Sequence, residues 1–459
     1  MPFPVASFPD ARPGVPRPGE LDYLRWKLAP EFLRPDYARN LTGVAPTILS
    51  LLGRENVGPL GSGAAALTPW LPARSPRRAR RVFLLCLDGL GFKELALSTR
   101  LKQLQERYGT WITSVFPSIT TSAMTSIYQG LPPSRHGILG HQIWKDFPGG
   151  VVDMLQMQVH GAMSPLVSSG FDVNAWKREP GLLDGAQYEG IAAIQLMPQH
   201  IVGSGLSAYC YGNTRLAGFQ EPLEGFAKAA HLLGSVTQGW VGLYLPTVDT
   251  LAHAFGGDGA PMGLALRQIE ENLAWMASTL SPQVLGETAL MVVTDHGQST
   301  VRRKIRVEEP AAKWLEKHTR AIGYSGRVMH VYLGRDSAGE AEPVAAYLES
   351  LIGDAGQVFR YAQVRELVGP EPDGTPSDEA WVRQSLGDMV VILRDGVKWD
   401  RPRKDEEPFP YGTPLVSHHG ALSPDEMIVP LIVAPLEAAL GESKTILPPQ
   451  HDVKEAPQR

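Results

Sequence analysis

Cysteine is scarce in this sequence: 459 residues contain only Cys86 and Cys210. A framework of several disulfides is therefore excluded, and such scarcity is typical of proteins in a reducing compartment. Cys86 lies inside an apolar run, so we expect it to be a small core residue. The N-terminus also lacks the basic segment and apolar run of a secretory signal. These absences favour a cytoplasmic location.

Long apolar runs and an excess of basic charge are also missing. No apolar run reaches the roughly 18 residues of a membrane-spanning helix, so we expect no membrane insertion. Lys and Arg number 43 against 48 Asp and Glu, giving a formal net charge of -5. This balance disfavours docking on nucleic acid. A small anionic substrate would then need local positive charge, from metal ions or a few side chains, and no oligomeric state is indicated.

Strand and helix patterns alternate along the chain from about residue 82. Short apolar runs that end at turn residues predict five buried strands: Val82–Leu87, Ile191–Leu196, Trp240–Leu245, Thr288–Thr294 and Met427–Val433. Longer amphipathic segments predict four helices: 94–108, 122–129, 222–233 and 262–280. This alternation is typical of an α/β fold with a mostly parallel central sheet. We also predict a short strand over Ser207–Cys210 and a weak helix over Leu21–Leu33.

Composition divides the chain into four expected parts. They are an irregular N-terminal extension packing on the core (1–80), a metal-binding catalytic α/β core (81–301 and 413–440), an α+β insertion (302–412) and a polar tail (441–459). The insertion is expected from a change of texture after residue 300, where short strands and helices follow one another. Its position in the chain favours a cap over the site.

Side chains of the metal-ligand type gather at the predicted strand ends. They are Asp88, Asp249, His253, Asp295 and His296 after strands, and His418 and His419 before the last one. In open α/β sheets the ligand site lies at the carboxyl ends of the strands. Asp249 and His253 are four residues apart and would share one face of a helix.

Each of these motifs alone has a simpler structural explanation, since Asp-Gly after a strand is usually a turn. Together they predict a metal site, because Asp and His are ligands that zinc and similar ions select. Three Asp and three or four His exceed the needs of one tetrahedral ion and favour two. The other histidines lack this context and are expected to be ordinary surface or core residues.

A cluster of hydroxyl side chains runs from Ser118 to Thr125, after Pro117. These hydroxyls could cap the predicted helix that follows, because Ser and Thr satisfy the unpaired amides of a helix start. Alternatively, one of them could be a nucleophile at the positive end of that helix, where an anion would also bind. The residues alone leave both explanations open.

Five segments together resemble the alkaline phosphatase superfamily, and within it the bacterial branch of the type I phosphodiesterase/nucleotide pyrophosphatase family. They are LLCLDGLG, FPSITTSAMTSIYQGLPPSRHGILGH, VDTLAHAFG, VVTDHGQS and SHHGALSPDEMIVPL. The resemblance implies an alkaline-phosphatase-like three-layer α/β/α sandwich with a mostly parallel central sheet and a smaller α+β cap insertion. It also implies hydrolysis of a small phosphorylated substrate, a phosphodiester or nucleotide-like compound.

The resemblance further implies roles for individual residues. The nucleophile falls at Thr120, with Thr121 as the local alternative, and would form a phosphothreonine intermediate. One divalent ion would be held by Asp88, Thr120, Asp295 and His296. A second would be held by Asp249, His253 and His419, because the family places this histidine directly before Gly; His418 is the alternative. The two ions would be zinc, with manganese as the other candidate.

Other functions use the same residues. A phosphonate hydrolase or a phosphomonoesterase could be built on this site, and a catalytically inactive metal-binding module is the alternative from a different class. A sulfatase is disfavoured, since neither Cys86 nor Cys210 lies in the C/S-x-P-x-R context that such enzymes need. A phosphomutase is disfavoured because no long insertion follows Thr120 directly.

Overall fold

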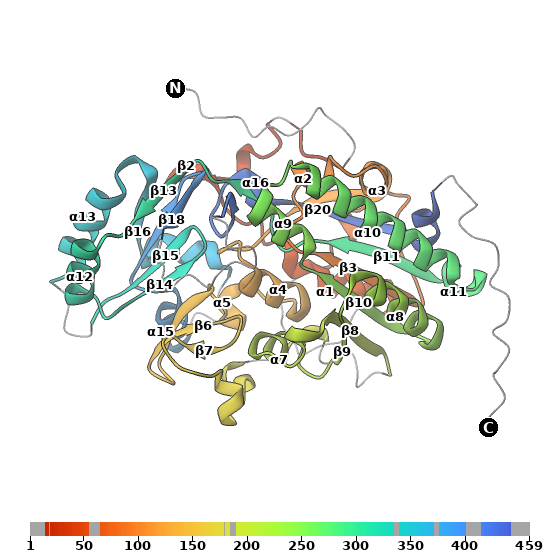
Figure 1. Cartoon of the computed structure of the whole chain (residues 1–459), viewed down its shortest axis with the longest axis horizontal. Coiled ribbons are helices and arrows are strands. Elements are labelled where there is room, and N and C mark those ends of the chain that lie inside the picture. The colour runs from red at the N-terminus through yellow and green to blue at the C-terminus, as the bar shows by residue number, and fades with distance from the viewer. Residues whose placement is uncertain are drawn as a thin grey trace.

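The computed structural model describes residues 14–17, 19–54, 65–178, 180–183, 190–334, 339–370, 376–400 and 415–441. Its centre is a seven-stranded sheet in the order β4-β20-β11-β3-β10-β8-β9 (Figure 1). The strands are β3 (Arg81–Leu87), β4 (Gly109–Thr113), β8 (Ala192–Pro198), β9 (Arg215–Phe219), β10 (Gly239–Leu245), β11 (Thr288–Val293) and β20 (Ile428–Pro435). Only β20 runs antiparallel to its neighbours in this sheet, which confirms the mostly parallel arrangement.

Both faces of the sheet are covered by helices, because apolar side chains of β3 point alternately to the two faces and both sets must be buried. Phe83 and Leu85 point into one core, while Leu84 and Cys86 point into the other. The first core includes side chains of α3 (Arg100–Tyr108), α8 (Pro222–Ser235) and α10 (Ala260–Thr279). The second includes side chains of α1 (Val44–Leu51), α4 (Thr120–Gln129) and α7 (Gly205–Tyr211). The result is the expected three-layer α/β/α sandwich.

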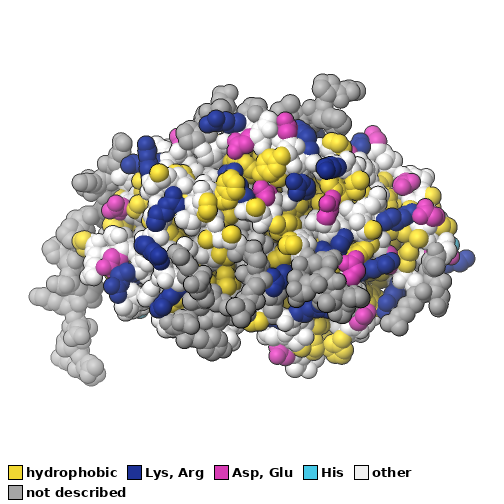
Figure 2. Space-filling model, turned by 180° about the vertical axis from the view of Figure 1, so that it is seen from behind, with side chains coloured by type: hydrophobic (Ala, Val, Ile, Leu, Met, Phe, Trp, Pro, Cys, Tyr) yellow, Lys and Arg dark blue, Asp and Glu magenta, His cyan; other side chains and the backbone are white. Residues whose placement is uncertain are grey.

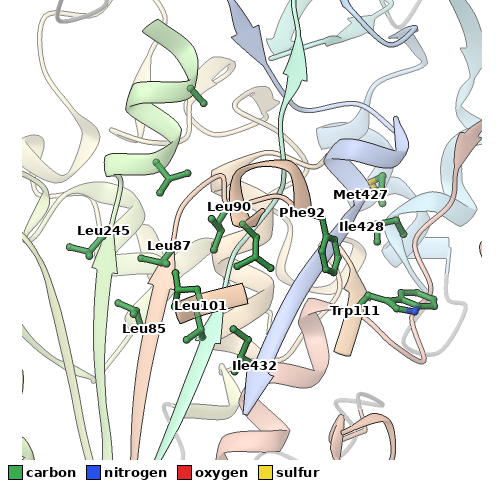
Figure 3. Packing of buried hydrophobic residues seen from close by; sticks show 14 of the residues in the cluster. Leu85, Leu87, Leu90, Phe92, Leu101, Trp111, Leu245, Met427, Ile428 and Ile432 are labelled. Carbon is green, nitrogen blue, oxygen red and sulfur yellow. The ribbon is translucent and has the colours of Figure 1, made fainter. Parts of the chain in front are cut away.

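The carboxyl ends of the central strands rest on tightly packed apolar side chains. Figure 3 shows Leu87 of β3, Leu245 of β10 and Leu90 beside α2 (Phe92–Leu95), all of them fully or almost fully buried. Burying one such side chain contributes about 1.5–3 kcal/mol. This packing fixes the backbone at the ends of these strands, and so fixes where the residues that directly follow them lie.

A second, four-stranded sheet lies to one side of the central one (Figure 1). Its strands are β14 (Ala321–Ser325), β15 (Val328–Tyr332), β17 (Met389–Leu393) and β16 (Gly356–Arg360). One face packs on α12 (Glu309–His318) and α13 (Ala341–Ile352). The other face contacts the N-terminal hairpin of β1 (Arg25–Trp26) and β2 (Ala29–Leu33), where the Trp26 and Phe359 rings lie 4.6 Å apart.

Shorter elements complete the described chain. The helices are α5 (Pro133–His136), α9 (Thr247–Phe255), α11 (Pro282–Gly286), α14 (Tyr361–Val364), α15 (Pro376–Leu386) and α16 (Pro424–Met427). The strands are β5 (Gln142–Lys145), β6 (Gly150–Asp153), β7 (Gln158–Val159), β12 (Ser299–Thr300), β13 (Arg303–Arg306), β18 (Val397–Asp400) and β19 (Ser417–His418). Strands β5, β6 and β7 form a small sheet, while β12 pairs with β19 and β13 with β18.

Three secondary-structure predictions were wrong. Residues Ser207–Cys210 form part of helix α7 instead of a strand, because the Ser204 hydroxyl accepts the N–H of Ser207 and caps a helix. The predicted helix over 94–108 is divided into α2 and α3, with the Ser98 hydroxyl bonded to Glu270 between them. The predicted helix over Leu21–Leu33 is a 3-10 turn followed by the β1–β2 hairpin.

A buried ion pair joins the four-stranded sheet to the core. Arg327, in the turn between β14 and β15, pairs with Glu426 of α16, and both side chains are at most 1% exposed. The guanidinium also donates to the carbonyl of Val397 (2.8 Å). Glu426 in turn accepts the N–H groups of Ala421 and Ser423, each at 3.1 Å. The pair therefore fixes the segment that follows His419.

The surface of the described chain is mixed in charge. Figure 2 shows Lys and Arg side chains interspersed with Asp and Glu over the face opposite to that of Figure 1.

Within the described ranges, no helix combines the length and apolar character that crossing a bilayer requires. Both cysteines are buried and neither forms a disulfide, and Cys86 is a core residue as expected.

We expect Arg327→Met to lower the free energy of unfolding of the metal-free protein by about 3–5 kcal/mol, since it leaves the Glu426 carboxylate buried without its partner. Urea unfolding followed by circular dichroism measures this change. The control is Arg306→Met, which breaks an exposed pair with Asp400 (2.6 Å) and should cost at most about 1 kcal/mol. Equal losses in the two variants would contradict a special role for the buried pair.

Candidate active site

The predicted ligand residues converge at the carboxyl edge of the central sheet. Asp88 directly follows β3, and Asp295 follows β11. Helix α9 begins immediately after β10 and places Asp249 and His253 on one face, four residues apart. The antiparallel pairing of β19 with β12 brings the segment of His419 to the same edge.

The first cluster consists of Asp88, Asp295 and His296, each at most 2% exposed. His296 Nε2 lies 3.6 Å from Asp88 Oδ1 and 3.2 Å from Asp295 Oδ2. Neither of these carboxylate oxygens has a hydrogen-bond partner. Burial raises the pKa of Asp88 well above its ordinary value, and the neighbouring Asp295 and Asp249 carboxylates raise it further. A bound cation would oppose both effects.

The second cluster surrounds Asp249, whose side chain is 17% exposed. Asp249 Oδ1 lies 3.3 Å from His253 Nε2 and 3.5 Å from His419 Nε2. The His296 and His419 rings stack with centroids 3.5 Å apart, so the two clusters are contiguous. The structure thus brings six predicted site residues, Asp88, Asp249, His253, Asp295, His296 and His419, into one region.

Backbone carbonyls fix the orientation of three imidazoles. The Nδ1–H groups of His253, His296 and His419 donate to the carbonyls of Ser417 (2.8 Å), Gly297 (3.1 Å) and Ser118 (3.2 Å), in that order. A carbonyl only accepts hydrogen bonds, so Nδ1 carries the proton and Nε2 of a neutral ring presents a lone pair. Metal-ligating histidines are oriented in this way. Burial, followed by the adjacent histidines, lowers the pKa of His419 well below its ordinary value and keeps it neutral.

The Nδ1 atom of His418 accepts a hydrogen bond instead of donating one, although its ring lies near those of His253 and His419. Its Nδ1 accepts the backbone N–H of His419 at 3.0 Å. The proton of a neutral His418 ring is therefore on Nε2. This tautomer separates His418 from the three histidines whose Nε2 lone pairs face carboxylates.

The chemistry of the two clusters fits divalent cations. Lone pairs of imidazole nitrogen and carboxylate oxygen face one another at 3.2–3.6 Å, an arrangement that a cation between them stabilises. The unpartnered oxygens of Asp88 and Asp295 support this reading. Mixed nitrogen and oxygen ligands suit zinc and, with lower affinity, manganese. The residues that could hold such ions are Asp88, Asp295 and His296 in the first cluster and Asp249, His253 and His419 in the second, and a nitrogen of His418 also lies within 4.8 Å of nitrogens of His253 and His419.

Thr120 is the first residue of α4 and lies beside the first cluster. Its Oγ1 is 3.2 Å from His296 Nε2, and because that nitrogen accepts, the hydroxyl donates. Amides of the first helical turn lack partners within the helix and favour an anion there. Thr121, by contrast, is fully buried and donates its hydroxyl to the Gly140 carbonyl at 2.9 Å.

Two further side chains, Tyr244 and Gln298, contact the ligand-type residues, and a third, Ser417, contacts Gln298; none of the three was predicted from the sequence. The Tyr244 hydroxyl donates to Asp88 Oδ2. Gln298 Nε2 donates to Asp249 Oδ1 at 2.6 Å, and the Ser417 hydroxyl donates to Gln298 Oε1 at 2.9 Å. Tyr244 gave no signal because it lies within an apolar strand. Gln298 and Ser417 lie within two residues of predicted ligands, and that proximity was the available signal.

Two other buried histidines have structural partners outside the clusters. His136 bonds the Ser126 hydroxyl at 2.9 Å, and His330 bonds the Ser325 hydroxyl at 2.8 Å. Burial lowers their pKa values to about 3 and about 4. Both rings are therefore neutral core groups, as we expected for histidines away from the strand ends.

The sequence and the fold of this chain are similar to those of known proteins. Residues 82–421 match the family model for type I phosphodiesterase/nucleotide pyrophosphatase. No curated protein sequence matched. Human ectonucleotide pyrophosphatase/phosphodiesterase 5 has a similar structure, with a TM-score of 0.56 and 14% identity over 77% of this chain and 87% of that chain.

Two other solved structures are similar. Phosphonoacetate hydrolase of Sinorhizobium meliloti in complex with phosphonoformate has a TM-score of 0.55 and 17% identity over 81% of this chain and 97% of that chain. The murine ectonucleotide pyrophosphatase/phosphodiesterase 5, an inactive threonine-to-alanine variant in complex with AMP, has a TM-score of 0.55 and 15% identity over 77% and 87%. At these identities the likeness concerns the fold.

Gly89, directly after Asp88, permits the close approach of the two clusters. Its φ is +74°, and a Cβ there would lie 2.8 Å from Gln298 Nε2 and 3.0 Å from the Asp249 Cα. We therefore expect Gly89→Ala to lower the free energy of unfolding through both backbone strain and crowding.

The matched control for this substitution is Gly161→Ala, where φ is +79° and no atom lies within 4 Å of the added Cβ. Urea unfolding should show that Gly89→Ala is less stable than this control by about 1–3 kcal/mol, the cost of crowding alone. Equal stability of the two variants would contradict the steric argument.

Proposed function

Because this chain belongs to the type I phosphodiesterase/nucleotide pyrophosphatase family and is a phosphoric ester hydrolase, we propose that it cleaves phosphodiester or nucleotide-like substrates with Thr120 as nucleophile. The observation behind this proposal is the placement of the Thr120 hydroxyl 3.2 Å from His296, between ligand-type residues and a helix start. AMP in a murine structure of the same fold supports a nucleotide-like substrate. The engaged hydroxyl of Thr121 argues against the alternative nucleophile.

We propose that the chain binds two divalent ions, zinc in preference to manganese. One would be held by Asp88, Thr120, Asp295 and His296, and the other by Asp249, His253 and His419. The tautomers support His419 over His418, because of these two residues His419 directs an Nε2 lone pair toward Asp249, whereas the Nε2 of a neutral His418 carries the proton. When bound, such ions lower the pKa of a hydroxyl and stabilise negative charge on phosphoryl oxygens.

The reaction would proceed in two displacements at phosphorus. Thr120 Oγ, having lost its proton to solvent, forms a bond to phosphorus while the bond to the leaving alcohol breaks, and the alcohol departs with the electron pair and takes up a proton. Water then attacks the phosphothreonine and gives up a proton to solvent, and the bond from phosphorus to Oγ breaks. The phosphoryl product leaves, and Oγ takes up a proton, which restores Thr120. The amides that begin α4 would hold the phosphoryl oxygens in both steps.

The insertion between the two parts of the core would influence the leaving group. The turn between β14 and β15 contacts the second cluster directly, since Arg327 donates its backbone N–H to the His419 carbonyl at 3.1 Å. We propose that residues 302–412 form the cap, of which 335–338, 371–375 and 401–412 lie outside the described residues. A cytoplasmic location also belongs to this proposal and rests on the scarcity of cysteine, since the chain has only Cys86 and Cys210.

We expect Thr120→Ala to lower the rate of diester cleavage by at least about a thousandfold, because it removes the atom that attacks phosphorus. Metal content and the unfolding midpoint should stay close to those of the unaltered protein. Thr121→Ala is the matched control and should keep activity within about tenfold, as it loses one structural hydrogen bond. An active Thr120→Ala with an inactive Thr121→Ala would move the nucleophile by one residue.

Metal analysis paired with hydrolysis of bis-p-nitrophenyl phosphate tests the function as a whole. We expect two metal ions per chain and diester cleavage that a chelator abolishes and added zinc restores. Cleavage of p-nitrophenyl phosphate should be slower than that of the diester. Dominant monoester or phosphonate cleavage would keep the site but change the substrate class, and a protein with neither metal nor activity would be a binding module.

A further inference from the structure

The second cluster is held together by a short chain of side-chain hydrogen bonds. Gln298, only 3% exposed, donates Nε2 to Asp249 Oδ1 at 2.6 Å. Its Oε1 accepts the Ser417 hydroxyl at 2.9 Å. The Ser417 carbonyl in turn accepts Nδ1–H of His253 at 2.8 Å. Two of the three residues of this cluster are therefore connected through Gln298 and Ser417.

The chemistry of Gln298 suits this place. A carboxylate only accepts hydrogen bonds, so the amide must present Nε2 to Asp249 and Oε1 to the Ser417 hydroxyl, and its orientation is unique. An amide is also neutral, so it orients Asp249 without cancelling the negative charge that attracts a cation. A lysine or arginine there would orient the carboxylate but repel the ion.

The position of Gln298 is fixed from the backbone as well. It lies between Asp295–His296 and β12, and Ser417 lies on β19, which pairs with β12. The Ser417 Oγ also lies 3.1 Å from the Ser299 carbonyl, which shares the single hydroxyl proton with Gln298 Oε1. Gln298 is thus anchored on the segment of the first cluster while it contacts the second.

We infer that Gln298 is a positioning residue for the second divalent ion, holding Asp249 in the orientation that, together with His253 and His419, binds it. The inference rests on the proposed function, since it assumes that this cluster binds a metal. Gln298 acts through Asp249 and Ser417 and has no part in the bond-making steps. The hydroxyl of Tyr244 has the equivalent place for the first ion, because it donates to Asp88 Oδ2.

The test is equilibrium dialysis of the full-length protein against buffered free Zn²⁺, with bound zinc counted per chain. Gln298→Met keeps the length of the side chain and removes both hydrogen bonds. We expect it to weaken binding of one zinc ion by about 10- to 100-fold and to leave the other unchanged. Gln195→Met is the matched control, a fully buried glutamine in β8 that should leave both ions unchanged.

Two further variants keep the inference open to refutation. Ser417→Ala leaves the amide in place, frees its Oε1 and should weaken the same ion by a smaller factor. Tyr244→Phe should weaken the other ion, so combining it with Gln298→Met should lower the affinities of both. The unfolding midpoint of the metal-free protein should be similar for Gln298→Met and Gln195→Met.

The outcomes separate the inference from the proposed function. Two bound ions in the unaltered protein, with Gln298→Met binding both as tightly, would overturn the inference and leave the function standing. Equal weakening of both ions by Gln298→Met, or the same weakening by Gln195→Met, would also overturn it. An unaltered protein that binds no zinc or manganese would overturn the metal-dependent mechanism itself.

Discussion

The structure depends on one electrostatic constraint, the crowding of acceptor atoms at the edge of the central sheet. Carboxylate oxygens of Asp88 and Asp295 lie 3.6 and 3.2 Å from the Nε2 lone pair of His296, largely out of contact with water. These acceptor atoms repel one another unless a cation neutralises them. In the absence of a cation, the rest of the fold must hold them in place. The buried apolar strands hold the residues at their carboxyl ends in fixed positions, and the Arg327–Glu426 pair holds the segment that follows His419.

Backbone groups, more than side chains, set the direction of the ligand atoms. Three carbonyls orient His253, His296 and His419, and each belongs to a loop or strand end whose position the sheet fixes. A carbonyl is present at every residue, so these contacts put few demands on side-chain identity. Solved structures share the fold at 14–17% identity, which is consistent with this, since apolar residues of similar volume can exchange within the layers.

The sequence predicted the features that follow from local pattern. Apolar runs stopped by Asp indicated both the sheet and the edge where Asp88 and Asp295 would meet. The four-residue spacing of Asp249 and His253 indicated a shared helix face, and α9 has it. The prediction of a strand over Ser207–Cys210 was wrong, because the pattern of four residues of mixed polarity does not distinguish a strand from a capped helix turn. Periodicity describes which face a residue occupies and contains no information about its partners across the chain.

The supporting residues illustrate what such patterns omit. Tyr244 lies among apolar residues of β10, and its hydroxyl has a role only because β3 ends beside it with Asp88. Gln298 is an ordinary polar residue after a strand until the β12–β19 pairing brings Ser417 to its Oε1. In both cases the information is a contact between segments distant in sequence, created by the order of strands. The ligands themselves are recognisable as residue types, whereas the groups that orient them are ordinary residues whose role depends on the completed fold.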